Sequence, residues 1–126
     1  MSALDDARAH LAKAREFLEA AELNNDLRLY NAASSNAVTA GINSKEAICL
    51  ALTGRTDKTE NHQQARAELR AAGPAGRQVE PTLTRLLKLK PKAHYQSSPV
   101  SAADAARAVE WATRMVEKAA EVVVRG

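Results

Sequence analysis

Aromatic residues are scarce in this sequence of 126 residues: one Trp, two Tyr and one Phe make up 3% of it. A hydrophobic core must therefore be built mainly from Ala, Leu and Val, and small side chains let helices approach one another closely. Hydrophobic residues still reach 45% and charged residues 26%, which is typical of a folded globular protein and excludes a disordered chain. A chain of this length buries one core, so we expect a single domain over residues 1–126.

Cysteine is almost absent, since Cys49 is the only one, and an intrachain disulfide is therefore excluded. Its neighbours Ile48 and Leu50 are apolar, which predicts a buried thiol. Long hydrophobic runs are lacking too, because no apolar stretch approaches the length of a membrane span, about 20 residues. The opening sequence Met-Ser-Ala-Leu-Asp-Asp is acidic, unlike a signal peptide. We therefore expect a cytoplasmic protein with no membrane partner.

A concentrated charge of one sign is also missing. The 18 Lys and Arg residues exceed the 15 Asp and Glu residues, which gives a formal net charge of +3, but the cations are spread along the chain. This balance is compatible with a polyanionic partner without indicating one strongly. Neither His10, in a stretch that we expect to be exposed, nor His62, in the first turn of a helix, has zinc-type spacing to another His or Cys. We expect no metal and no cofactor.

Apolar residues recur at steps of three and four along most of the chain, which predicts amphipathic helices. The expected helices cover residues 2–24, 28–53, about 59–72, 79–87 and 101 onward. Gly54 is a natural end for the second of these, and Pro91 should interrupt the fourth because it lacks an amide hydrogen. Ser101 and Asp104 predict a capped start for the last helix. The fold class that follows is all-α: an antiparallel up-and-down bundle of four to five helices.

Groups that could act on phosphate are concentrated in residues 85–96. They are Arg85, Lys88, Lys90, Lys92, His94 and Tyr95. Lys and Arg can stabilise the charge on a transferring phosphoryl group, and His can give or take a proton near neutral pH. A metal-independent ribonuclease needs both roles. The alternative is that the three lysines solvate one surface and that His94 and Tyr95 pack where the chain turns.

The second expected helix offers polar residues that could support such a site. Glu46, beside Asn43 and Ser44, could supply a carboxylate to the interior of the bundle. Asn36 lies on a related face, because the ten residues between it and Glu46 make about three helical turns. The alternative is that Glu46 is a solvated helical residue.

Several segments occur in an order that resembles the HEPN superfamily, the small helical domains of prokaryotic nucleotide-binding and ribonuclease systems. They are residues 12–21, 29–33 and 37–47, then His62, and finally residues 86–95 followed by Val100-Ser101-Ala-Ala-Asp104. The resemblance covers nearly the whole chain. It implies an antiparallel helical bundle that forms homodimers and that often partners a minimal nucleotidyltransferase in a toxin–antitoxin pair.

Several HEPN proteins are toxins that cleave RNA, and their signature is an Arg followed four to six residues later by a His. The resemblance assigns the His of this signature to His94. Lys88 lies six positions before His94, whereas Arg85 lies nine positions before it. The chain therefore has Lys where the family has Arg, and Lys cannot make the planar, bidentate phosphate contact of a guanidinium.

Two hypotheses follow from this departure. In the first, His94 is the acid–base residue, Lys88 and Lys90 hold the scissile phosphate of RNA and Tyr95 orients the site, while a dimer supplies paired sets. Arg85 and Lys92 would add phosphate contacts. Under this first hypothesis the chain is an endoribonuclease toxin. In the second, the same basic region binds a nucleotide, a nucleic acid, or a nucleotidyltransferase or antitoxin partner without catalysis.

Overall fold

Five α-helices make up the described part of the chain, and these residues include no strand. The computed structural model describes residues 2–57, 61–94 and 97–125, with residues 91–94 described by their backbone alone. The helices are α1 (Ala3–Asp26), α2 (Tyr30–Thr53), α3 (His62–Ala71), α4 (Pro74–His94) and α5 (Ala102–Arg125). The all-α class predicted from the sequence is confirmed. Across these residues, no helix combines the length and the apolar composition that crossing a membrane requires.

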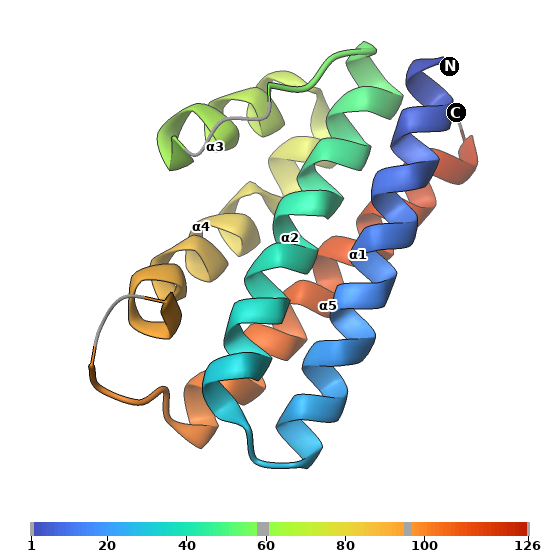
Figure 1. Cartoon of the computed structure of the whole chain (residues 1–126). Helices are drawn as coiled ribbons and strands as arrows, with labels where there is room; N and C mark the ends of the chain where they lie inside the picture. The colour runs from blue at the N-terminus through green and yellow to red at the C-terminus, as the bar shows by residue number, and fades with distance from the viewer. Residues whose placement is uncertain (1, 58–60, 95–96, 126) are drawn as a thin grey trace.

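The centre of the bundle is α2, because it packs against each of the other four helices. Figure 1 shows α1 and α4 running in one direction and α2 and α5 in the other, so that the long helices alternate up and down. Both termini lie at the same end of the bundle. Within the described residues, the short helix α3 contacts only α2 and α4, and it lies at the side of the bundle.

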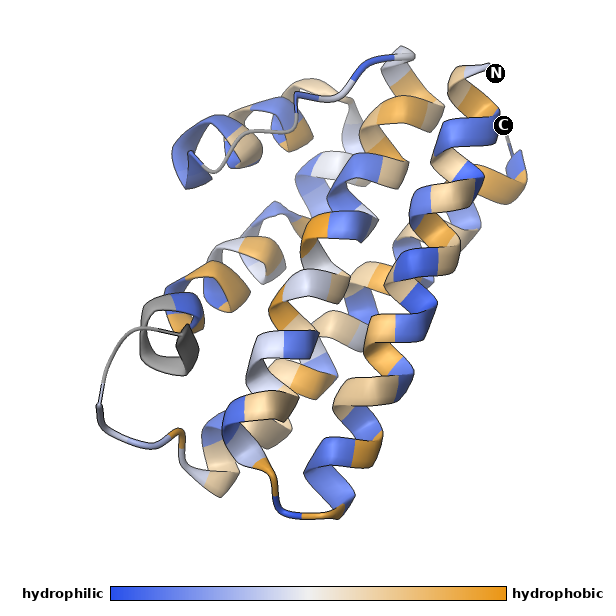
Figure 2. Cartoon of the chain, in the orientation of Figure 1, coloured by the Kyte–Doolittle hydropathy of each residue, from blue (hydrophilic) through white to orange (hydrophobic). Residues whose placement is uncertain are grey.

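Small residues line the contacts among α1, α2 and α5, as the scarcity of aromatic residues predicts. Fully buried alanines on these three helices are Ala7, Ala14, Ala21, Ala33, Ala37, Ala40, Ala47, Ala105, Ala108, Ala112 and Ala119. Larger buried side chains supply the remaining volume of the core, and they include Ile48, Leu69, Leu83, Leu86 and Met115. In Figure 2, α1 alternates between hydrophobic and hydrophilic residues along its length, whereas α3 is mostly hydrophilic. Close helix packing therefore stabilises the long helices more than α3.

Local sequence signals set the ends of the long helices. At the start of α1, Ser2 Oγ accepts a hydrogen bond from the backbone N of Asp5 at 3.0 Å, and Asp5 Oδ2 accepts one from the backbone N of Ser2 at 3.2 Å. Gly54 ends α2 with a φ of 75°, a left-handed conformation that costs glycine little. Ser101 Oγ accepts from the backbone N of Asp104 at 3.1 Å at the start of α5. The predicted helix ends at Gly54 and Ser101 are confirmed.

The fourth helix is longer than the sequence predicted. The expected interruption at Pro91 is wrong, because α4 runs without a break from Pro74 to His94. A proline inside a helix removes one backbone hydrogen bond, and here only residues 92–94 follow it. Leu86 and Leu87, about one turn earlier, are buried and hold α4 against the bundle. This tertiary packing outweighs the local cost of the proline.

Candidate nucleic-acid interface

Exposed cations lie along α4 in the segment that the sequence singled out. Arg85 and Lys88 are both exposed, and their spacing of three residues puts them on one face of the helix. Lys90 is half-buried, and its spacing of two residues from Lys88 turns it to a different face. The structure therefore brings Arg85 and Lys88 together and separates Lys90 from them.

A pocket of about 360 Å³ lies between α3 and α4 beside these cations. Thr84, Leu87 and Lys88 line it from α4, and His62 and Arg66 line it from α3. Among the described residues that line this pocket, none is acidic. The pocket joins an ammonium, a guanidinium and an imidazole in one concave surface, a combination that suits phosphate.

Arg66 was not predicted as a site residue. Its spacing of four residues from His62 puts both side chains on one face of α3, and this spacing was the signal that could have found it. The role of that face depends on how α3 packs against α4, which the helical pattern does not reveal. We name the surface formed by His62, Arg66, Arg85 and Lys88 the basic face.

The end of the predicted cluster falls outside the described residues. The backbone of Lys92 and His94 continues α4, but their side chains and the whole of Tyr95 lie outside the described part of the chain. The proton-transfer role of His94 and the phosphate-binding roles of Lys92 and Tyr95 stay predictions.

Glu46 is buried and paired, so the alternative of a solvated carboxylate is wrong. Its Oε2 lies 3.0 Å from Nδ1 of His10, and the same nitrogen lies 3.0 Å from Oδ1 of Asn43. His10 and Glu46 are each 8% exposed, which also corrects the expectation that His10 is exposed. Helical spacing explains this burial, because Ala7 and Ala14, three residues before His10 and four after it, lie on the buried stripe of α1.

Asn36 does not join this buried pair. Its Nδ2 donates a hydrogen bond to Oδ1 of Asn24 at 2.8 Å, which connects α2 to the last turns of α1. The predicted association of Asn36 with Glu46 therefore does not appear among the described contacts, and Asn36 stabilises the α1–α2 contact instead.

A buried lysine is the other polar feature that the sequence did not reveal. Lys45 on α2 is 2% exposed, and its Nζ donates to Oγ1 of Thr56 at 3.0 Å, the carbonyl O of Asp57 at 3.2 Å and Oε1 of Glu68 at 3.1 Å. The other carboxylate oxygen, Oε2 of Glu68, accepts a hydrogen bond from the backbone N of Asp57 at 2.9 Å. This network ties the loop after α2 to α3.

Cys49, one turn along α2 from Lys45, has the buried thiol that its apolar neighbours predict. Burial disfavours the thiolate and raises the pKa of Cys49 to about 11, although the nearby Lys45 ammonium acts in the opposite direction. The thiol therefore stays protonated and unreactive at neutral pH.

No known protein family and no curated protein matches this chain.

Proposed function

We propose that this chain binds RNA through the basic face. The observation that carries the proposal is the pocket between α3 and α4, which three side chains of the basic face line and in which none of the described lining residues is acidic. Neutralisation of backbone phosphates supplies most of the affinity in nucleic-acid binding that does not depend on base sequence. A concave surface with cations from two helices suits that task.

The individual side chains suit different parts of RNA recognition. The guanidinium of Arg66 can donate two parallel hydrogen bonds to one phosphate. Arg85 lies about one turn from Lys88 on the same face of α4, so it extends the cationic surface beyond the pocket. A free nucleotide would occupy the pocket alone, whereas a strand would contact Arg85 as well. The extent of the basic face therefore favours an RNA strand over a mononucleotide.

The HEPN resemblance supports a more specific proposal for the same face. The chain would be a HEPN-like homodimer and the toxin-like half of a pair with a nucleotidyltransferase or an antitoxin. Lys88 would hold the scissile phosphate, and His94 would transfer a proton without a metal ion. Because Lys88 stands where the family has Arg, the basic face supports RNA binding more strongly than it supports RNA cleavage.

RNA binding is tested by fluorescence anisotropy with labelled single-stranded RNA and the full chain over a series of salt concentrations. The double variant Arg66→Gln/Lys88→Gln should weaken binding by at least about tenfold and reduce the slope of log Kd against log salt. Arg8→Gln/Arg15→Gln is the matched control, since it removes the same charge from exposed residues of α1. Equal losses in the two double variants, or no binding by the unmodified chain, overturn the proposal.

RNA cleavage needs a separate assay, in which the chain is incubated with transfer RNA in the presence of a metal chelator. Cleavage that is lost in both His94→Ala and Lys88→Gln supports the endoribonuclease hypothesis. Cleavage that His94→Ala retains, or its absence from the unmodified chain, rejects catalysis by His94. Either result leaves the binding assay as an independent test of the basic face.

A further inference from the structure

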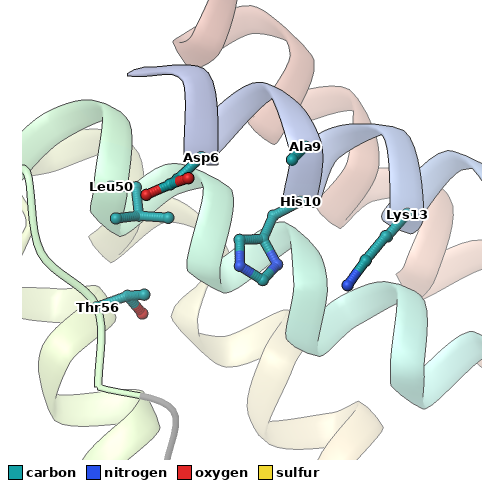
Figure 3. A pocket seen from close by; sticks show the side chains of 6 residues that line it. All are labelled: Asp6, Ala9, His10, Lys13, Leu50 and Thr56. Atoms are coloured by element: carbon teal, nitrogen blue, oxygen red, sulfur yellow. The ribbon is translucent and has the colours of Figure 1, made fainter. Parts of the chain in front are cut away.

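A second pocket of about 360 Å³ opens between α1, the end of α2 and the loop that follows α2. Figure 3 shows His10 between Asp6 and Lys13, all three from α1, with Leu50 from α2 and Thr56 from the loop. None of these residues belongs to the basic face. The pocket is therefore a separate place at which the chain could bind a ligand.

The imidazole of His10 is held in one orientation at this pocket. Its Nδ1 lies 3.0 Å from both Glu46 Oε2 and Asn43 Oδ1. The oxygen of the Asn43 amide faces His10, because its Nδ2 donates to the carbonyl O of Thr39 at 3.0 Å. Both neighbours of Nδ1 are acceptors, so Nδ1 carries the proton in the neutral ring and Nε2 keeps its lone pair. Since the side of the ring that carries Nδ1 faces α2, the other nitrogen, Nε2, is the one that can bind a ligand in the pocket.

Two other residues that line the pocket carry hydrogen-bond donors. Lys13 lies three residues after His10 on the same face of α1, and its side chain is exposed. Thr56 also lines the pocket, and its Oγ1 accepts a hydrogen bond from Nζ of the buried Lys45 at 3.0 Å, so its hydroxyl proton is available to another acceptor. Asp6, one turn before His10, adds one carboxylate to the lining.

We propose that this pocket binds a small phosphate monoester, with its phosphate group between Lys13, Thr56 and Nε2 of His10. The ammonium and the hydroxyl donate to phosphate oxygens. The second pKa of a phosphate monoester is about 6, so the phosphate can hold or release one proton near neutral pH. That proton can be shared in a hydrogen bond between a phosphate oxygen and Nε2 of His10. When His10 holds it, the carboxylate of Glu46 stabilises the resulting imidazolium.

The charges of the pocket select a single phosphate over a polyphosphate or an RNA strand. Lys13 is the one cation among the described residues that line the pocket, so it balances a single negative charge, and the Asp6 carboxylate repels further negative charge. A ligand hydroxyl, in contrast, can donate a hydrogen bond to Asp6. A volume of about 360 Å³ is in the range of small-molecule sites. A sugar phosphate, which combines one phosphate with several hydroxyls, therefore fits the pocket in both charge and size.

The proposal is tested by NMR of the histidine side chains in the full, isotope-labelled chain. Inorganic phosphate, and in a second titration ribose 5-phosphate, is added at constant ionic strength near neutral pH. The assigned His10 signals should shift saturably with both ligands. In Lys13→Gln the Kd for ribose 5-phosphate should rise about tenfold, because the ammonium is lost. Arg15→Gln, which removes the same charge from another exposed residue of α1, should change the Kd by less than about twofold.

Two outcomes overturn the proposal. One is the absence of a saturable His10 shift beyond the shift that chloride produces at the same ionic strength. The other is an equal loss of affinity in Lys13→Gln and Arg15→Gln, since that would reflect only the general charge of α1. Because both substituted side chains are exposed, neither variant should disturb folding, and the titrations remain interpretable.

Discussion

Replacement of Glu68 by alanine should leave the buried ammonium of Lys45 without its carboxylate partner. The Lys45 side chain is 3% exposed and the Glu68 side chain 26% exposed, so the cation of the pair is far from water while the anion is partly hydrated. Removing one partner of a buried ion pair costs about 3–5 kcal/mol, because the remaining charge stays buried. Thr56 and Asp57 still accept hydrogen bonds from Nζ, which places the expected loss near the lower end, about 3 kcal/mol.

The assay is equilibrium unfolding in urea, with the free energy of unfolding and the slope m fitted for each variant. Glu110→Ala is the matched control, because Glu110 forms an exposed pair with Arg114 on α5, and it should change the free energy by less than about 0.5 kcal/mol. In Lys45→Met/Glu68→Ala the buried charge is gone, so this double variant should be more stable than Glu68→Ala alone.

Two results would refute this reasoning. A loss of less than about 1 kcal/mol in Glu68→Ala would mean that water or the neutral acceptors compensate the ammonium fully. A double variant no more stable than Glu68→Ala would mean that the cost comes from lost contacts of Glu68 and not from the uncompensated charge of Lys45.

Three further predictions concern other parts of the chain. Gly76→Ala should lower the free energy of unfolding in urea by about 2 kcal/mol, because a Cβ there would overlap the backbone carbonyl of Leu69. The cost of this overlap should exceed the gain of about 1 kcal/mol in helix propensity that alanine brings. With a pKa of about 11, Cys49 should react with iodoacetamide far more slowly in the native chain than in urea at pH 8, as mass spectrometry would detect. The backbone N–H of Ser2 and, to a smaller extent, its hydroxyl lower the pKa of Asp5. Ser2→Ala removes only the hydroxyl, so the pKa of Asp5 should rise part of the way toward its ordinary value in an NMR titration; the stabilisation from this cap is present above the ordinary pKa of Asp and is lost as pH falls through the lowered one.

Much of the fold could be predicted because its signals are local. The helical spacing of apolar residues from residue 101 onward and the cap at Ser101 depend only on residues close in sequence, and the helix and its start are both confirmed. The end of α2 at Gly54 follows from a glycine that tolerates positive φ. Pro91 is the exception, since the same kind of local argument predicted a break that packing of α4 against the bundle prevents.

The candidate sites were predictable only in part. The sequence singled out Arg85 and Lys88 as candidate phosphate ligands, but they share a helical face only because α4 continues beyond residue 87. The contribution of His62 and Arg66 to the pocket beside Lys88 depends on the packing of α3 against α4. That packing cannot be read from α3, because a short and mostly polar helix carries a weak hydrophobic pattern. The packing of α3 against α4 was therefore needed before the basic face could be proposed as a phosphate-binding surface.

By itself, the sequence determined the all-α class and the small-residue core, because helical period, capping and composition act over a few residues. Only the tertiary structure decided that His10 meets Asn43, 33 positions away, and that Lys45 meets Glu68, 23 positions away. The physical reason is that burial of an ionisable side chain is acceptable only where another helix supplies its partner. Helical periodicity predicts the face of a helix on which a residue lies, whereas the tertiary fold determines which residues contact that face.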